Sequence, residues 1–455
     1  MEVFCTSPWV PPEWIKAHGL EPRGVWLAPD FAAEPLPLAA GVCAFANAAV
    51  RLAHRQTQSA VIFTTHCDQL RRGFDAVAQP ALPMNPVGTR STASHSLRAK
   101  SETRWNASLP GSEVQGASNG RGVLSRLFLF NLPVTWQTPV AQRIFCDELR
   151  RLGQFLIGLG GHAPATRDLV EIMAQYNHAR RRLLAAALWC PARAYAEAVA
   201  RFHLDGSVRL PPEPAAAAPG LITTTTPATP PPTLNLDTNP NLNPTPTPNP
   251  NLLNLNSIPL ALVGGPLPQS QLPLLDAIEK AGGRVVLNAT EAGERSLRPP
   301  DPWKPGGPAD HPSPALKGPL SPSNGERAGL RGLTSVPSTP SHLDGSEPVS
   351  LWPASPPDQP QPAALLALLA RSCLVNCVDV FQRPNTRLYD WLRVRLTARQ
   401  ARGIILWHYV GCDLWRAEAQ PLRAAFGLPV LLLDADEAAP QRHTSRLEAF
   451  LESLR

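Results

Sequence analysis

The sequence has no long apolar run. None of its apolar stretches reaches the roughly 18 residues that a membrane-spanning helix needs. The first residues, Met-Glu-Val-Phe-Cys-Thr-Ser-Pro, contain neither the basic region nor the apolar region of an export signal. We therefore expect a cytoplasmic protein. Because the cytoplasm is reducing, we expect its eight cysteines to be thiols or metal ligands rather than disulfides.

Charge of one sign is not concentrated anywhere in the chain. The 42 basic residues exceed the 36 acidic residues by six, which gives a net charge of +6. This excess is scattered, without the basic block or the interleaved aromatic residues that nucleic-acid-binding proteins use. The composition therefore disfavours a nucleic-acid partner, just as the lack of long apolar runs disfavours a membrane partner.

Proline and glycine, in contrast, are abundant and unevenly placed, with 53 and 30 residues. Three segments rich in Pro, Gly, Ser, Asn or Thr have no apolar period and cannot bury a core. We predict a disordered insertion at 79–122, a low-complexity linker at 208–257 and a second disordered insertion at 298–361. The linker would separate an N-terminal domain, 1–207, from a C-terminal domain, 258–455.

Between these segments, short apolar runs alternate with amphipathic helical patterns. This alternation is typical of βαβ units with buried parallel strands. The expected strands are 24–27, 59–64, 127–130, 259–263, 284–287, 403–407 and 429–433. The expected helices are 43–53, 69–77, 140–159, 166–184, 191–202, 272–280, 363–370, 386–399, 414–426 and 444–454. The sequence therefore predicts an α/β fold of two domains, with parallel sheets flanked by helices and interrupted by long Pro-rich insertions.

Three cysteines occupy similar places in this pattern. Cys67 and Cys412 each lie a few residues after an apolar strand and just before a helix, and Cys43 begins another predicted helix. Ligands bind at the carboxyl ends of parallel strands, and a helix N-terminus favours the thiolate that binds metal. The alternative is that each thiol is a small buried side chain, which is common for free cysteine.

The spacing of these cysteines does not select a metal. The chain lacks the compact Cys-x-x-Cys pairs of zinc ribbons, which disfavours a zinc site built from neighbouring residues. Iron–sulfur clusters need thiolates but do not need close spacing along the sequence. An iron–sulfur cluster and three structural thiols both remain open on residue types alone.

Six short strings follow one another in a recognisable order. Three contain the cysteines: Ala-Gly-Val-Cys-Ala-Phe at 40–45, Thr-His-Cys-Asp-Gln-Leu-Arg-Arg at 65–72 and Val-Gly-Cys-Asp at 410–413. The others are Phe-Asn-Leu-Pro at 130–133, Gly-Gly-Pro-Leu-Pro at 264–268 and Pro-Val-Leu-Leu-Leu-Asp at 429–434. In this order the strings resemble the motifs of the 2-hydroxyacyl-CoA dehydratase and benzoyl-CoA reductase family, and the chain is similar to the 2-hydroxyglutaryl-CoA dehydratase D-component.

The resemblance implies a [4Fe–4S] cluster held by Cys43, Cys67 and Cys412, with the fourth iron open to substrate. It implies radical dehydration or reduction of an acyl-CoA thioester. The partners would be that thioester, an ATP-dependent iron–sulfur activator that supplies one electron, and a paralogous second subunit or a second copy of the chain. No catalytic side chain is assigned beyond the ligands.

Two alternatives to an enzyme stay open: a non-catalytic electron-transfer or assembly protein with the same cluster, and a cluster-free scaffold. The segment Asn-Ala-Thr-Glu-Ala-Gly at 288–293 favours a divergent relative, because many members of the family carry another cysteine there.

Several other side chains are weaker candidates. His66 and His408 could tune the cluster, or could simply be packed or solvated. Arg71 and Arg72 could meet CoA phosphates, or could form the solvated face of a helix.

The remaining cysteines are expected to be structural. Cys146 and Cys190 fall in helical patterns and are expected in the core, and Cys5 lies near an end expected to fray. Cys373 and Cys377 are interpreted as two buried thiols, with extra cluster ligation as the alternative.

Overall fold

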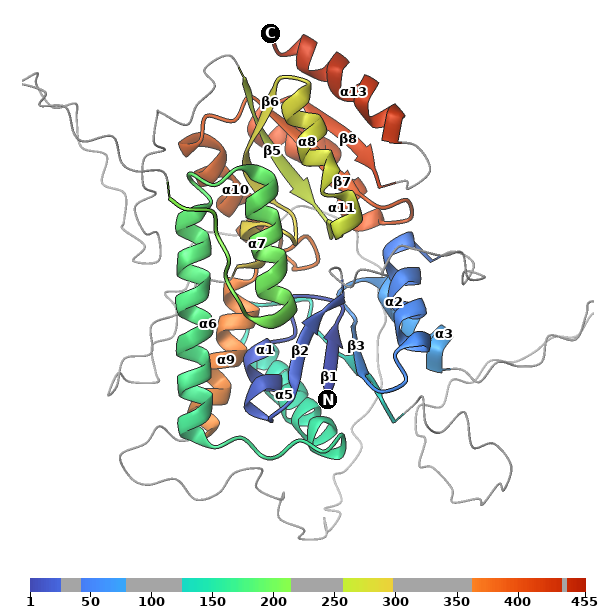
Figure 1. Ribbon diagram of the computed structural model, residues 1–455, viewed down its shortest axis with the longest axis vertical. Coiled ribbons are helices and arrows are strands. Elements are labelled where there is room, and N and C mark those ends of the chain that lie inside the picture. Colours follow the sequence, from blue (N-terminus) through green and yellow to red (C-terminus); the bar gives the residue numbers. More distant parts are fainter. Residues whose placement is uncertain (26–41, 79–124, 214–256, 298–361, 436–439) are drawn as a thin grey trace, which may run out of the picture.

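The computed structural model describes residues 1–25, 42–78, 125–213, 257–297, 362–435 and 440–455 (Figure 1). The predicted insertions at 79–122 and 298–361 lie outside these ranges, as does most of the predicted linker. None of the described helices is long and apolar enough to cross a membrane.

Four parallel strands form the first sheet, in the order β2-β1-β3-β4. Their bounds are β1 Glu2–Cys5, β2 Glu21–Gly24, β3 Ala60–Thr64 and β4 Leu127–Phe130. Every residue of β3 is buried, as expected for an inner strand of a parallel sheet. This explains why its sequence, Ala-Val-Ile-Phe-Thr, is an apolar run without alternation.

Four further parallel strands form the second sheet, in the order β6-β5-β7-β8. Their bounds are β5 Ile258–Gly264, β6 Gly283–Ala289, β7 Gly403–His408 and β8 Val430–Asp434. All six residues of β7 are buried, since β7 lies between β5 and β8. The predicted α/β class, with parallel sheets flanked by helices, is confirmed.

Both sheets have the same strand order. In each, the second strand pairs with one edge of the first strand and the third strand pairs with the other edge. A parallel sheet leaves a crevice for ligands at the carboxyl ends of its strands where the order reverses in this way. In Figure 1 the strands of the two sheets run toward the middle of the molecule from opposite ends, so their carboxyl edges face each other.

Helices flank both sheets. Those that precede the second sheet along the chain are α1 Pro12–Ala17, α2 Ala44–Arg55, α3 Asp68–Ala78, α5 Pro139–Gly158, α6 Thr166–Ala186 and α7 Ala192–Asp205. The others are α8 Pro273–Lys280, α9 Pro362–Asn376, α10 Thr386–Ala398, α11 Asp413–Ala417, α12 Ala419–Phe426 and α13 Pro440–Ser453, with 3-10 turns η3 Gln269–Gln271 and η4 Glu294–Ser296.

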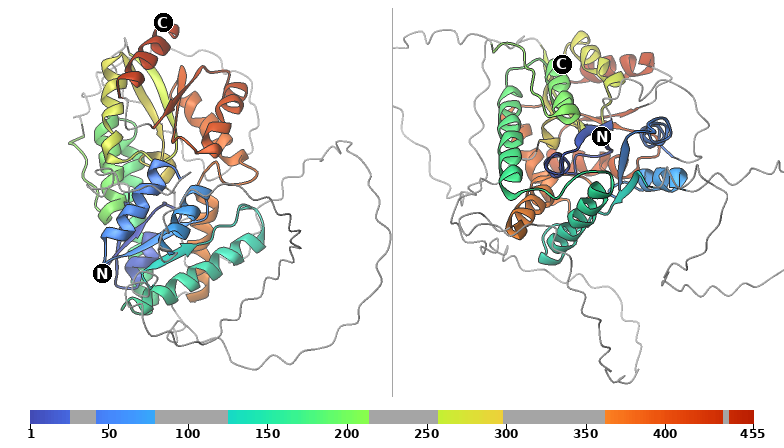
Figure 2. Two further views of the ribbon diagram at one scale, coloured as in Figure 1. Left: turned by 90° about the vertical axis from the view of Figure 1, so that its right-hand side faces the viewer. Right: turned by 60° about the horizontal axis from the view of Figure 1, so that its bottom comes forward.

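Helix α9 comes late in the sequence but packs against the first sheet's helices. Its Leu366 and Leu369 share a buried cluster with Phe145 and Leu149 of α5, and the views of Figures 1 and 2 place the two helices together. The chain therefore crosses back between the halves. The division into domains at 1–207 and 258–455 stays a prediction.

A second buried cluster spans both sheets. It contains Val61 and Phe63 of β3 together with Leu262 of β5 and Trp407 of β7. The rings of Phe45, at the start of α2, and Tyr409, just after β7, lie 5.9 Å apart. The facing carboxyl edges are therefore joined by a continuous apolar core.

The predicted elements agree with the structure except near the N-terminus, after β7 and in α9, which continues past the predicted end at 370 to Asn376. Strand β1 was not predicted, and β2 begins three residues before the predicted strand at 24–27, part of which lies outside the described residues. The single helix predicted at 414–426 is divided at Glu418 into α11 and α12. The carboxylate of Glu418 accepts a hydrogen bond from Asn385 at 2.9 Å and another from Tyr389, contacts that local sequence does not reveal.

Candidate functional site

Cys43 is the N-cap residue of α2. Its sulfur accepts a hydrogen bond from the backbone N–H of Ala46 at 3.5 Å, so the thiol meets the donor end of the helix. The backbone N–H of Cys43 donates to Oε1 of Gln69 at 2.9 Å. Since Gln69 lies two residues after Cys67, this bond ties the first cysteine motif to the second.

Cys67 lies between β3 and α3. Its carbonyl oxygen accepts the hydrogen bond from the N–H of Arg71 that begins the helix. Arg71 and Arg72 contact the carboxylate of Asp68 at 3.0 and 2.7 Å, and both side chains are more than half exposed. This matches the solvated helix face that was the alternative to a CoA-phosphate role.

Cys412 is the N-cap residue of α11, reached from β7 by a tight turn. Its backbone N–H donates to the carbonyl of Tyr409 at 2.9 Å. The turn passes through Gly411, whose φ of +85° is readily adopted only by glycine. Cys67 and Cys412 therefore follow the third strand of their respective sheets, which are equivalent places in the two halves.

The three thiols gather at the same apolar cluster. Cys43 is part of the cluster that spans both sheets, and Cys67 and Cys412 are half-buried against it. Burial, together with the neighbouring thiols of Cys412 and Cys43, raises the pKa of Cys67 to about 12. The three predicted ligands, which are far apart in the sequence, are thus close enough to affect one another's ionisation.

The same forces act on the other two thiols. Burial raises the pKa of Cys412 to about 11, opposed by the backbone N–H of Trp415. Burial also raises the pKa of Cys43, opposed by the N–H of Ala46. The isolated thiols are therefore protonated at neutral pH. A metal group would displace the protons, because the thiolate is the form that ligates metal.

The donor set consists of three thiols. Within the described parts of the chain, no group of three or more His, Cys, Asp or Glu side chains that could hold a metal ion is found. A [4Fe–4S] cluster binds each cysteine through a different iron, so its thiolates need not meet at one point. Three separate thiols around one cluster of side chains are compatible with that group.

The two histidines near the cysteines are packed. His66 is buried, its Nδ1 lies 2.7 Å from the hydroxyl of Thr64, and its ring contacts Phe381 edge-on. Burial lowers the pKa of His66 to about 4, so the ring is neutral at pH 7. His408 is also buried, with Nε2 2.7 Å from a carboxylate oxygen of Asp434. A tuning role for either histidine stays a prediction.

A buried arginine, Arg295, holds the edge of the second sheet together. Its guanidinium donates hydrogen bonds to the carbonyl oxygens of Gly264, Ala289 and Val378, at 2.9, 3.1 and 3.2 Å, and to the carboxylate of Asp379. It also lies over the ring of Trp415 in α11, 5.0 Å from the ring centre. One side chain therefore connects the ends of β5 and β6, the loop after α9 and the helix that Cys412 begins.

Glu291 lies beside this clamp. It is 3% exposed, and burial raises its pKa to about 8, while Arg295 lowers it and Asp379 raises it. The charges of Asp379 and Glu291 also raise the pKa of Cys412. Sequence reasoning missed these polar residues as site residues. Its one relevant signal was the unusual segment at 288–293, which contains Glu291.

The remaining cysteines follow the prediction in part. Cys373 and Cys377 are buried in the core cluster around α5, whereas Cys146 and Cys190, expected in the core, are half-buried and each packs against the edge of a core cluster. The expectation of a frayed end at Cys5 was wrong: Cys5 is buried in β1, and burial raises its pKa. Two neighbouring strands of the sheet hold the N-terminus in place.

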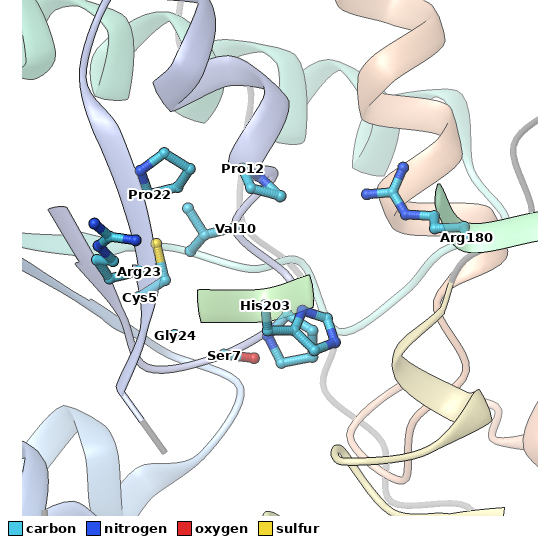
Figure 3. Close-up of a pocket in the computed structure, with 10 residues that line it drawn as sticks. Cys5, Ser7, Val10, Pro12, Pro22, Arg23, Gly24, Arg180 and His203 are labelled. Atoms are coloured by element: carbon cyan, nitrogen blue, oxygen red, sulfur yellow. The ribbon is translucent and has the colours of Figure 1, made fainter. Parts of the chain in front are cut away.

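A pocket lies at the carboxyl ends of β1 and β2, where the sequence predicted no site (Figure 3). Arg180 of α6, Arg23 of β2 and His203 of α7 contribute its polar lining. The cations already have partners: Arg180 pairs with Glu13, and Arg23 lies 2.9 Å from Glu2. We therefore assign it no charged ligand.

Comparison with known protein families gives one match. Residues 345–454 match the model of the 2-hydroxyglutaryl-CoA dehydratase D-component. The matched segment is about a quarter of the chain and includes β7, Cys412 and β8, but neither Cys43 nor Cys67. A comparison with curated proteins gives no match.

Proposed function

Since the chain belongs, through residues 345–454, to the 2-hydroxyglutaryl-CoA dehydratase D-component family, we propose that it is an iron–sulfur subunit acting on an acyl-CoA thioester. Cys43, Cys67 and Cys412 would hold a [4Fe–4S] cluster between the two sheets. The family is generally associated with iron–sulfur cofactors, and the assignment to these three residues is ours.

One observation carries the proposal. Each of the three thiols lies at the start of a helix, at the carboxyl edge of a parallel sheet, and all three contact one apolar cluster. Helix N-termini stabilise anionic sulfur, because backbone N–H groups point toward it. This shared environment favours a common ligand over three separate structural thiols.

When bound, such a cluster supplies an electron at low potential, which allows a thioester to lose a hydroxyl group or to be reduced. The chain's own residues hold the group and limit its contact with water. The N–H groups of Ala46 and Trp415 stabilise the thiolates of Cys43 and Cys412. Gln69 anchors the backbone of Cys43. The surrounding apolar cluster limits access of water, so the surroundings of the bound group have a low dielectric constant. Nearby charges can therefore shift its reduction potential.

The family implies two kinds of partner for this chain. We propose that an ATP-dependent iron–sulfur activator supplies the electron, and that a paralogous second subunit or a second copy completes the enzyme. The alternative is an electron-transfer or assembly protein that holds the same cluster without turning over a thioester.

Iron and sulfide analysis after anaerobic purification and reconstitution tests the cluster. We expect the wild-type chain to contain both elements, and Cys43→Ala, Cys67→Ala and Cys412→Ala each to lose most of them. Cys190→Ala is the matched control, because Cys190 is half-buried but lies outside the site. Equal iron loss in the control, or full retention in the three variants, would contradict the assignment.

A second measurement separates the enzyme from the electron-transfer protein. Acyl-CoA thioesters are added to the reduced, cluster-loaded chain, and the visible and electron paramagnetic resonance spectra are recorded. A change specific to a thioester supports an acyl-CoA enzyme. An intact cluster that responds to no thioester supports electron transfer or assembly.

A further inference from the structure

Glu291 is a buried carboxyl group without a hydrogen bond. Its Oε2 has no hydrogen-bond partner among the described residues, and its Oε1 lies 3.8 Å from Arg295, too far for a hydrogen bond. Buried polar side chains nearly always have a partner, because an unpaired one loses its contacts with water without replacement. The described residues therefore leave this carboxyl group free to form a hydrogen bond with another molecule.

Hydrogen bonds and close packing fix the turn that contains Glu291. Oδ1 of Asn288 accepts hydrogen bonds from the N–H and the hydroxyl of Thr290, at 3.1 and 2.7 Å. Gly293 closes the turn so tightly that a Cβ there would lie 2.1 Å from the carbonyl oxygen of Asn288. The backbone N–H of Glu291 faces the carbonyl of Gly265, just after β5, at 3.4 Å. A turn this constrained holds the carboxyl group in one place at the edge of the sheet.

The charges facing Glu291 come from two other segments. Arg295, one turn further along, and Asp379, from the loop after α9, are the groups that affect its ionisation. Arg295 is already paired with Asp379 and donates hydrogen bonds to three backbone carbonyls, so it does not require Glu291 as a counter-ion. Burial therefore dominates and raises the pKa of Glu291 to about 8. At neutral pH the side chain is mostly an uncharged acid, with a hydroxyl group that can donate a hydrogen bond.

We propose that Glu291 is a substrate-binding residue that, as a neutral acid, donates a hydrogen bond to an uncharged oxygen of an acyl thioester bound beside Cys412. The thioester as ligand rests on the proposed function. The location beside Cys412 rests on Arg295, which lies 3.8 Å from Glu291 and over the ring of Trp415 in α11, the helix that Cys412 begins. With Glu291 protonated and Arg295 paired with Asp379, these three residues carry no net charge, which suits an uncharged acyl group.

The test compares two thioesters that differ by one hydroxyl group, 2-hydroxybutyryl-CoA and butyryl-CoA. Their binding to the cluster-loaded chain is measured by calorimetry for the wild type, Glu291→Gln and Glu291→Leu. Gln keeps a neutral donor at this position, whereas Leu removes it. We expect Glu291→Leu to bind 2-hydroxybutyryl-CoA about tenfold more weakly and Glu291→Gln to bind it nearly as well as the wild type. Glu448→Gln, on the exposed face of α13, is the control.

Butyryl-CoA identifies the oxygen that is bound. Unchanged binding of butyryl-CoA to Glu291→Leu assigns the hydrogen bond to the hydroxyl group, and a parallel loss assigns it to the thioester carbonyl. We also expect wild-type binding to weaken above the pKa of Glu291, while binding to Glu291→Gln stays constant. An infrared carbonyl band of a protonated carboxylic acid, present in the wild type at neutral pH and absent in both variants, checks the protonation without any thioester.

The possible outcomes distinguish a failure of the proposed acyl-CoA function from a failure of the role of Glu291. If the cluster-loaded wild type binds neither thioester, the proposed function fails and the role of Glu291 fails with it. If the wild type binds and Glu291→Leu binds equally well, the function stands and only the role of Glu291 is overturned. A loss in Glu291→Gln as large as in Glu291→Leu overturns the neutral-donor role, because it would show that the carboxylate is needed. Thermal unfolding of both variants identifies any loss caused by misfolding.

Discussion

The two sheets share one strand order, but their facing edges carry different chemistry. The first edge contributes two thiols, Cys43 and Cys67, held by helix starts and by local contacts such as the bond from Cys43 to Gln69. The second edge contributes one thiol, Cys412, and a buried ionic clamp centred on Arg295. Because the two sheets share one topology, equivalent edges face each other. The loops that follow the strands differ in sequence, so the two edges carry different side chains.

The difference extends to how each edge is stabilised. The core beside the first edge is aromatic and aliphatic, with rings of β4 and α5 packed together. At the second edge, three backbone carbonyls accept hydrogen bonds from the guanidinium of Arg295, which forms its ion pair with Asp379. We therefore expect the second edge to be more sensitive to a single substitution.

Removing the clamp should have the largest effect on stability. Arg295→Met leaves Asp379 buried without its counter-ion and removes the guanidinium donor from three carbonyls. We expect the free energy of unfolding to fall by about 3–5 kcal/mol, the range for breaking one side of a buried ion pair. Denaturant titration measures this loss of stability. Arg193→Met, which replaces an exposed arginine, is the control and should unfold at nearly the same denaturant concentration as the wild type. Similar midpoints for both variants would remove the contrast between the two edges.

A substitution at the end of β5 should come next. Gly264 has a φ of +151°, and a Cβ there would lie 1.9 Å from the carbonyl oxygen of Trp407 on the neighbouring strand. We expect Gly264→Ala to cost about 3 kcal/mol from strain and overpacking. The first sheet has a cysteine, Cys5, at the end of its equivalent strand, so this close approach belongs to the second edge alone.

Gly160→Ala is the matched control for that experiment. Gly160 also has a positive φ, +95°, but nothing lies within 4 Å of the Cβ that would be added. We expect a cost of about 1 kcal/mol from the backbone alone. An equal loss of unfolding free energy in the two variants, by thermal and denaturant unfolding, would show that the carbonyl of Trp407 leaves room for a Cβ at Gly264.

One buried group near each sheet should make stability depend on pH, and the two effects should have opposite signs. Burial lowers the pKa of His18, near the first sheet, from 6.5 to about 4. Between these values the unfolded chain binds a proton that the folded chain does not, so stability rises with pH over this window. Glu291 has the opposite sign, because burial raises its pKa from 4.5 to about 8, and stability falls as pH rises across that window.

Variants isolate the two contributions. We expect His18→Gln to flatten the rise on the acid side by about 3 kcal/mol between the two pKa values of His18. Glu291→Gln should remove the opposing fall and gain stability relative to the wild type as pH increases toward 8. Denaturant unfolding across this pH range measures both. Parallel profiles for the wild type and either variant would show that the residue in question does not titrate as described.

Most of the fold could be predicted from the sequence because strands β3 to β8 each contain a run of three or more aliphatic or aromatic residues. Strand β1 escaped prediction because only Val, Phe and Cys mark it, next to the chain start. Strand β2, Glu-Pro-Arg-Gly, has no strand-forming side chain, and its pairing with β1 makes it a strand. Both failures are short segments whose conformation depends on their neighbours.

The candidate site divides in the same way. The places of Cys67 and Cys412, each between a buried strand and a helix start, were predictable because periodicity and helix starts are local properties. The clamp was not, since Arg295 and Asp379 are 84 residues apart in the sequence. No pattern along the chain reveals that these two side chains meet.

The sequence by itself determined the strand runs, the helix starts and the three cysteines at their junctions, because backbone preference and apolar period act over a few residues. The tertiary structure alone decided that the two carboxyl edges face each other and that the three thiols share one apolar cluster. It also decided that Glu291 is buried beside an arginine already paired with another residue. Burial and the pairing of charges depend on which distant segments pack together, and that information appears only when the chain is folded.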